Sequence, residues 1–340
     1  MGFLRSTLGR HLLYTVVAAV LLWLLTLVFS DYNNFQLATL GSYAIAIAGL
    51  SLLTGLNGQI SLGHGAFMMV GAYTTALLGK HSHLPLAVVL ILSAVAAAAA
   101  GLITGIGAAR LRGPYLAGVT LALAVGLPEL TIKYASALGG EQGVAVNPPV
   151  PPGFISQTSA NRYLAWIVII CALVTFLVLS NLIRSRFGRD FRAVRDDEIA
   201  ASLSGINVAR NQVLAFVVSA ACAGLGGAVY ALAIGIVNPA GFSLVLSIAL
   251  LTGAVIGGLG SLAGAVWGGL LLVYLPRVSD SLSSHLSLSK AVSSNLSLAI
   301  YGVVLIAVML SFPGGVQAGL RLATGAVRRR FGGSRRPRGA

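Results

Sequence analysis

The stretch YNNFQLATLGSYAIAIAGLSLLTGLNGQISLGHGAFMMVGAYTTALLG, residues 32–79, contains no Asp, Glu, Lys or Arg. About 20 apolar residues in a helix cross the hydrocarbon core of a bilayer, so this run is long enough for two spans. We expect the chain to break between them at Gly55-Leu56-Asn57-Gly58-Gln59. A helix break inside a bilayer is tolerated where protein or a water-filled cavity satisfies the freed backbone groups. The break therefore marks a candidate pathway.

The rest of the chain has the same apolar character. Of the 340 residues, 57% are hydrophobic and only 9% are charged, whereas ordinary soluble domains are about 25% charged. This composition excludes a soluble globular protein. Six further long charge-free runs cover 11–30, 81–109, 113–128, 163–183, 211–276 and 291–320. With two spans in 32–79 and three in 211–276, the runs predict an all-α polytopic membrane protein with about ten transmembrane helices.

The distribution of basic residues predicts the orientation. With the N-terminus inside, ten spans place 17 of the 22 basic residues on the inner side, and the remaining five on the outer side are Lys80, Lys133, Arg162, Arg277 and Lys290. This asymmetry follows the positive-inside rule, so both termini are expected in the cytoplasm. For the C-terminal arginines to lie inside as well, the number of spans must be even. This requires a second break, at Gly257-Gly258-Leu259-Gly260-Ser261 in the run 211–276.

The two breaks share a short pattern. Gly58-x-x-Ser61-Leu62 and Gly258-x-x-Ser261-Leu262 match at an offset of 200 residues. Such a match arises easily in a chain rich in Gly, Ser and Leu, so it is a weak signal of a repeat. Glycine-interrupted segments in corresponding positions of two halves are typical of repeat-built transporters.

The polar segment 184–212, predicted to be cytoplasmic, is the most informative one outside the spans. Its charged part ends at Glu198, and Ile199-Ala200-Ala201 leads to Leu203 and then to Gly205. Glycine ends helices, so we expect a short amphipathic helix between Glu198 and Gly205 that docks into a groove of another protein. A solvated cytoplasmic helix without a partner is the alternative.

Several motifs carry a family resemblance. Glu198-Ile-Ala-Ala-x-x-x-Gly205 resembles the E-A-A-x-x-x-G coupling loop of ABC-transporter permeases, with Ile199 in place of the first alanine. Four segments resemble the branched-chain amino-acid permease family of the LivM and LivH type: GQISLGHGAF at 58–67, RGPYLA at 112–117, AVRDDE at 193–198 and GGLGSLAG at 257–264. The four segments occur in the same order as in the family. Together they cover the chain from about residue 40 to 315. The R-G-x-Y segment and the G-G-x-x-G loop at 139–143 favour the LivM type.

The resemblance implies a permease subunit of an ABC importer in the bacterial plasma membrane, which moves branched-chain amino acids inward and is not an enzyme. It also implies cytoplasmic ATP-binding subunits, a second permease of the LivH type and an extracytoplasmic substrate-binding protein. By the same resemblance, the residues expected to couple the permease to the ATPase subunits are Arg195, Asp197, Glu198, Ala200, Ala201 and Gly205. Urea and short-chain amide permeases are similar across all four motifs and remain the alternative.

The sequence divides into a predicted membrane domain and a predicted basic tail. Residues 1–320 are the predicted transmembrane permease domain, with the coupling loop at 184–212, and residues 321–340 are a predicted basic cytoplasmic tail. The tail carries arginines with little aromatic interleaving, so attraction to anionic membrane lipid explains it better than nucleic acid does. The chain contains no G-x-x-x-x-G-K-S/T phosphate loop, so ATP must bind elsewhere.

The candidate residues of the substrate pathway come from the breaks, from the R-G-P-Y-L-A motif and from an acid in an apolar run. They are Gln59, Ser61, His64, Tyr115, Glu129 and Ser261. His64, the one histidine inside a predicted span, either contacts substrate or satisfies carbonyls freed by the break. Glu129 is a functional candidate because intramembrane acids are costly, yet Lys133 four residues later allows an i,i+4 ion pair instead.

Other classes of membrane protein fit less well. A membrane enzyme needs paired carboxylates or metal-ligand clusters within the bilayer, and the sequence indicates neither, nor a cofactor. The cysteines Cys171 and Cys222 each lie in an apolar run and are interpreted as small core residues. A proton- or sodium-coupled carrier remains open because broken helices supply ion sites. Broken-helix termini carry about half a unit charge, which suits a zwitterion with an aliphatic side chain.

Overall fold

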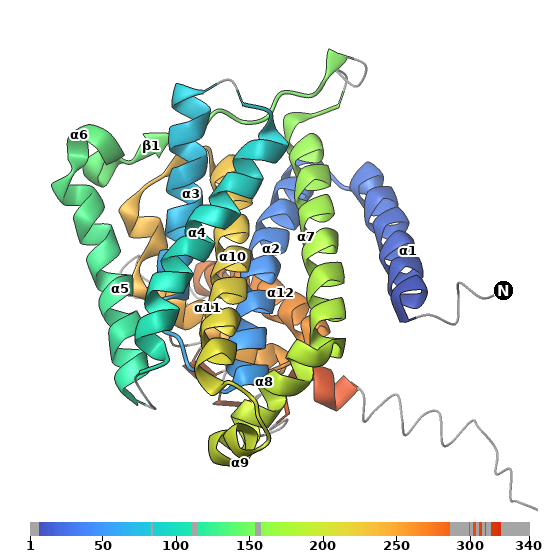
Figure 1. The fold of residues 1–340 in the computed structure, drawn as a ribbon. Coiled ribbons are helices and arrows are strands. Elements are labelled where there is room, and N and C mark those ends of the chain that lie inside the picture. The colour runs from blue at the N-terminus through green and yellow to red at the C-terminus, as the bar shows by residue number, and fades with distance from the viewer. Residues whose placement is uncertain are drawn as a thin grey trace, which may run out of the picture.

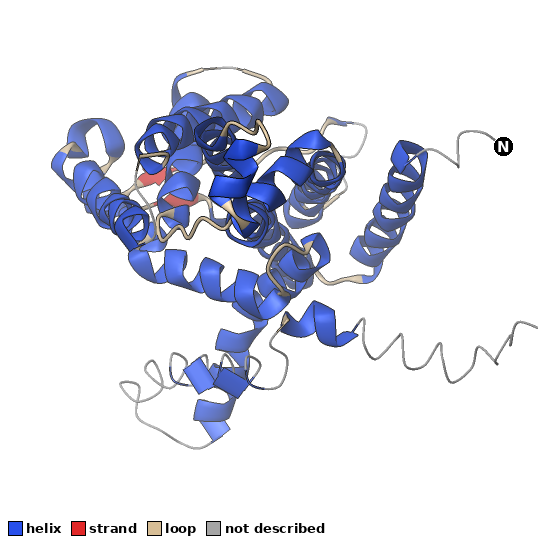
Figure 2. Cartoon of the chain, turned by 60° about the horizontal axis from the view of Figure 1, so that its bottom comes forward, coloured by secondary structure: helices blue, strands red, loops and turns tan. Residues whose placement is uncertain are grey.

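The computed structural model describes residues 7–82, 84–110, 114–153, 158–285 and 314–320, with isolated positions between 299 and 310. The predicted basic tail 321–340 and most of the last apolar run lie outside the described residues. Within the described part the chain is built from helices, with one short pair of strands (Figures 1 and 2).

The α-helices are α1 (Thr7–Val28), α2 (Asp31–Leu50), α3 (His64–His81), α4 (Leu86–Ala108), α5 (Pro114–Lys133), α6 (Ala135–Leu138), α7 (Ala160–Arg184), α8 (Arg186–Asp196), α9 (Glu198–Leu203), α10 (Val208–Ile234), α11 (Leu244–Gly257) and α12 (Leu262–His285). A π-helix, η2 (Ser51–Leu56), continues α2, and two short 3₁₀ helices are η3 (Gly140–Gln142) and η5 (Pro239–Phe242). Strand β1 (Val144–Ala145) pairs antiparallel with β2 (Ile236–Val237).

Six helical stretches among the described residues are long and apolar enough to cross a membrane, namely 31–56, 86–108, 115–133, 160–184, 208–234 and 239–257. Shorter apolar helical stretches cover Thr15–Val28 of α1 and Leu262–Val278 of α12. The expectation of an all-helical polytopic membrane protein is confirmed at this level.

Helix α10 lies at the centre of the bundle and contacts α2, α3 and α4 (Figure 1). Small residues on α10 permit this close approach. A Cβ added at Gly227 would overlap the Met68 carbonyl of α3, and one at Gly224 would overlap the Ala97 side chain of α4. The small residues of α10 therefore serve helix packing.

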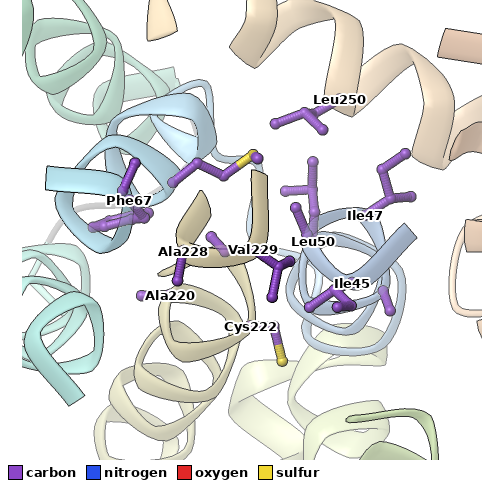
Figure 3. Close-up of a cluster of buried hydrophobic side chains, with 14 of the residues drawn as sticks. Ile45, Ile47, Leu50, Phe67, Ala220, Cys222, Ala228, Val229 and Leu250 are labelled. Atoms are coloured by element: carbon purple, nitrogen blue, oxygen red, sulfur yellow. The ribbon is translucent and has the colours of Figure 1, made fainter. Parts of the chain in front are cut away.

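The buried core around α10 is apolar and draws on α2, α3 and α11. Figure 3 shows part of it, with labelled side chains of Ile45, Ile47, Leu50, Phe67, Ala220, Cys222, Ala228, Val229 and Leu250. Cys222 is buried in this cluster, and Cys171 is partly buried on α7. Neither cysteine forms a disulfide, as expected for core residues.

The two ends of the bundle are defined by contacts between distant segments. At one end, Asn161 Nδ2 at the start of α7 donates to Asp31 Oδ2 at the start of α2 (2.6 Å), and β1 pairs with β2. At the other end, α8 and α9 lie beneath the bundle (Figure 1), and α8 contacts η2. We call these the β1–β2 end and the α8–α9 end.

Candidate functional site

Two interruptions of the helices meet at the α8–α9 end. The first break, residues 57–63, separates η2 from α3, and the second break, residues 258–261, separates α11 from α12. Gly58 (φ +80°) and Gly258 (φ +111°) adopt backbone conformations that favour glycine. A Cβ added at Gly55 would overlap the backbone nitrogen of Gly260. The end of η2, directly before the first break, therefore contacts the second break, and we call this contact region the glycine junction: Gly55 with Leu259 and Gly260.

Hydroxyl groups from neighbouring helices satisfy the backbone donors that the first break frees. The Leu62 N–H donates to Thr120 Oγ1 of α5 (3.0 Å), and the Gly65 N–H donates to Ser247 Oγ of α11 (3.0 Å). The start of α3 is thus closed by side chains from two other helices. This is the internal satisfaction of polar backbone groups that a bilayer requires.

His64 is fully buried at the start of α3. Its Nε2–H donates to the Ala46 carbonyl oxygen of α2 (3.0 Å), and its ring contacts Phe67 edge-on. Nδ1 has no hydrogen-bond partner among the described atoms. The Ala46 carbonyl lies within α2 and not in the break, so both interpretations of His64 stay predictions.

Three other predicted pathway residues also lie in the breaks. Gln59 and Ser61 are buried in the first break, where Ser61 Oγ accepts from the Gly63 N–H (3.4 Å). Ser261 is partly buried in the second break, and its Oγ accepts from the Gly264 N–H (3.4 Å). The structure therefore brings Gln59, Ser61 and His64 together and places Ser261 on the other segment of the same pair of breaks.

The two remaining predicted pathway residues lie apart from the breaks. Tyr115 is 75% exposed near the start of α5, and Glu129 is exposed further along the same helix. Helix α5 lies at the edge of the bundle (Figure 1). The side chains of Glu129 and Lys133, both described, form no ion pair within 4.0 Å. The structure does not bring Tyr115 or Glu129 to the cluster around His64.

The predicted helix after Glu198 is present as α9, with a well-defined start and end. Asp197 Oδ1 accepts from the backbone N–H groups of Ile199 (2.8 Å) and Ala200 (3.0 Å), which is the N-cap arrangement. At the other end, Gly205 has φ +84°, and the Ile206 N–H donates to the Ala201 carbonyl (3.0 Å). Because both ends are capped, this short helix holds a defined shape.

Helix α9 turns apolar side chains outward. Ile199 is 70% exposed and Leu203 is 85% exposed, whereas Ala201 is buried. Glu198 Oε1 accepts from Gln212 Nε2 (2.8 Å), which ties the start of α9 to α10. Two exposed aliphatic side chains on a fixed helix are suited to docking against another protein.

Sequence reasoning missed α8, which precedes α9 and carries Arg195. The signal for it was Ser185, whose Oγ accepts from the Phe187 N–H (3.2 Å) as an N-cap. Phe191 and Val194 are buried on one face of α8. The Arg195 side chain is 41% exposed, and its Nη1 donates to the Gly55 carbonyl at the end of η2 (2.8 Å).

A cavity of about 640 Å³ opens at the β1–β2 end. It lies beside the ends of α3 and α7 and the segment after β1, and its polar lining includes Thr75, Lys80, Ser82, Asn147 and Tyr163. In the described part of the chain no group of three or more His, Cys, Asp or Glu residues is arranged to hold a metal ion.

Comparison with known proteins decides the family. Residues 32–309 match the family described as branched-chain amino acid transport system / permease component. The chain belongs to this permease family. It is 32% identical over 253 residues to the high-affinity branched-chain amino acid transport system permease protein LivM of Escherichia coli (strain K12), covering 68% of this chain and 60% of LivM.

Two further relatives of this permease family match larger parts of their own length. The permease LivH of Escherichia coli (strain K12) is 31% identical over 305 residues, covering 83% of this chain and 93% of LivH. The permease BraD of Pseudomonas aeruginosa is 32% identical over 255 residues, covering 69% of this chain and 81% of BraD. The match to LivM spans less than two thirds of that relative. No solved structure matches the chain.

Proposed function

We propose that this chain is the membrane-spanning permease subunit of an ABC importer that moves branched-chain amino acids into the cell. The observation that carries the proposal is α9, a capped helix at the α8–α9 end that exposes Ile199 and Leu203. Exposed aliphatic side chains on a capped helix favour a docked partner over a carrier that works alone. The family membership supports the same class, because the relatives are named as transport permeases.

The proposed topology has ten spans with both termini in the cytoplasm of a bacterium. Its support is the direction of the chain: α2 and α7 start together at the β1–β2 end, and the end of η2 and α8 lie together at the other end. Helix α10 leads back from α9 to β2. The α8–α9 end is assigned to the cytoplasm because the basic loop 184–212 lies there. The apolar run 291–320 supplies the tenth span.

The proposed partners occupy opposite ends. Cytoplasmic ATP-binding subunits dock on α9, where burying Ile199 and Leu203 contributes about 1.5–3 kcal/mol for each side chain. An extracytoplasmic substrate-binding protein docks at the β1–β2 end, above the cavity beside α3 and α7. A second permease of the LivH type completes the membrane part. Tyr115 and Glu129 line the pathway if this second permease covers the exposed face of α5.

The proposed substrate is a zwitterion with an aliphatic side chain, such as leucine, isoleucine or valine. Around the breaks the structure offers hydroxyl groups, an imidazole and helix ends. Helix ends carry about half a unit charge, which suits a molecule whose carboxylate and ammonium offset each other. The binding protein then sets most of the selectivity, because these groups would also accept other small polar solutes.

Charged substitutions on α9 test the proposal. Ile199→Asp and Leu203→Asp are expected to abolish co-purification of the ATPase subunits and ATP-driven uptake, while the permease still inserts. Val150→Asp is the matched control for ATPase co-purification alone, because Val150 is 83% exposed at the opposite, β1–β2 end, where the ATPase subunits do not dock. ATPase subunits that still bind and drive uptake in both α9 variants would show that α9 is not the docking helix.

A further inference from the structure

Arg195, in the last turn of α8, forms a contact that spans 140 residues of sequence. Its Nη1 donates to the Gly55 carbonyl oxygen (2.8 Å), while Nε (3.0 Å) and Nη2 (2.7 Å) donate to Asp196 Oδ1. Gly55 lies in the last turn of η2, where carbonyls have no partner within the helix. The guanidinium, held in place by Asp196, therefore closes the helix end with a charge-assisted hydrogen bond.

The stem of Arg195 makes a second contact with the first break. Gly58 has φ +80°, and a Cβ added there would lie 2.9 Å from Arg195 Cγ. The absence of a side chain at Gly58 is what lets the arginine lie against the backbone. Arg195 thus contacts the end of η2 through a hydrogen bond at Gly55 and the first break through packing at Gly58.

Gly55 in turn contacts the second break. A Cβ added at Gly55 would overlap the Gly260 backbone, and one added at Gly260 would lie 3.3 Å from Leu56 Cδ2. Backbones that meet without intervening side chains leave little room for one to move alone. A displacement of Gly55 must therefore shift Gly260 as well.

Helix α8 links this junction to the exposed helix α9. Its buried face, Phe191 and Val194, holds it against the bundle, and a single residue, Asp197, separates it from α9. Asp197 is also the N-cap of α9. A tilt of α9 therefore acts directly on the end of α8 that carries Arg195.

We propose that Arg195 is a positioning residue that transmits movement of α8 and α9 to both breaks at once, through its contacts with Gly55 and Gly58. Family resemblance alone places Arg195 among the residues that couple to the ATPase; the geometry gives it a partner inside this chain. The inference rests on the proposed function, because the movement is that imposed by ATPase subunits docked on α9.

The test compares uptake per ATP hydrolysed in the complete complex, reconstituted in proteoliposomes with its ATPase subunits, second permease and binding protein. Arg195→Ala is expected to keep the ATPase subunits bound and active, while the ratio of leucine taken up to ATP hydrolysed falls about threefold, less than for a buried charge-assisted hydrogen bond because Arg195 is 41% exposed. Arg195→Lys, which keeps a charged donor, is expected to recover part of that ratio.

A second pair of variants covers the case in which Arg195→Ala does not fold. Gly58→Ala crowds the arginine stem and is expected to lower the same ratio. Gly235→Ala is its control, because Gly235 also has a positive φ (+76°) but lies at the β1–β2 end, where an added Cβ would meet nothing nearer than the Val146 carbonyl oxygen at 3.9 Å. It is expected to leave the ratio unchanged.

Several results would overturn the inference. Loss of ATPase co-purification in Arg195→Ala would make Arg195 an ATPase contact, and a wild-type ratio in Arg195→Ala or Gly58→Ala would show that the contact transmits nothing. An equal loss in Gly235→Ala would assign the effect to backbone strain. If the wild-type complex itself shows no ATP-driven uptake, the proposed function fails and this inference with it; if the wild type transports, only this inference is at stake.

Discussion

Replacing Asp197 with alanine removes the N-cap of α9. One carboxylate oxygen accepts from two backbone N–H groups, those of Ile199 (2.8 Å) and Ala200 (3.0 Å). Loss of such a cap costs about 1 kcal/mol of helix stability. Since about 1.4 kcal/mol changes an equilibrium constant tenfold, this loss lowers the equilibrium constant between folded and unfolded α9 about fivefold. A helix of six residues has no internal stability to offset this loss.

If docking needs a folded α9, the affinity for the ATPase subunits falls by up to about fivefold, because binding must then also fold the helix. The measurement is a titration of purified ATPase subunits against the permease complex in nanodiscs, with half-saturation read from binding. Asp197→Asn is the matched control, because its side-chain oxygen still caps the helix without the charge, and it should stay within about twofold of the wild type.

Two results would refute this reasoning. An unchanged affinity in Asp197→Ala would show that α9 needs no cap or does not dock. An Asp197→Asn variant as weak as Asp197→Ala would show that the charge, and not the cap, is recognised.

Three further outcomes are expected. Gly227→Ala, which would overlap a carbonyl of α3, should lower thermal stability in detergent by the equivalent of about 1–3 kcal/mol, whereas Gly79→Ala, with open space around it, should leave it unchanged. Thr120→Val, which leaves a buried N–H of the first break unpaired, should destabilise by about 1–3 kcal/mol, and Thr120→Ser should restore the wild-type value. In a background without the native cysteines, Pro149→Cys should react with an impermeant thiol reagent from outside the cell and Leu203→Cys only from inside; reaction of both from one side would contradict the ten-span topology.

Hydropathy predicted the all-helical, polytopic character because a bilayer requires long apolar runs, whereas the ten-span count and the orientation drawn from the basic residues stay predictions. The helix after Glu198 was predictable from the pattern that ends at Gly205. Helix α8 was missed because its many charges indicate a solvated loop, while its stability comes from burying Phe191 and Val194 against the bundle. That burial depends on tertiary packing, which the local pattern does not contain.

The candidate site was only partly predictable for the same reason. Gln59 and His64 lie where a break within an apolar run predicts functional or structural polar groups. Tyr115 was chosen from a motif alone, and the face of α5 that it occupies depends on which helices pack beside it. The contact between Arg195 and Gly55 joins residues 140 positions apart, and no local pattern in the sequence predicts it.

The most direct test of the account is uptake of radiolabelled leucine by proteoliposomes that hold the complete complex, with and without ATP. The account predicts uptake that requires ATP, the ATPase subunits and the binding protein, and that is blocked by excess isoleucine or valine but not by urea. Uptake of urea with no amino acid transported, or leucine uptake driven by an ion gradient without the ATPase subunits, would contradict it.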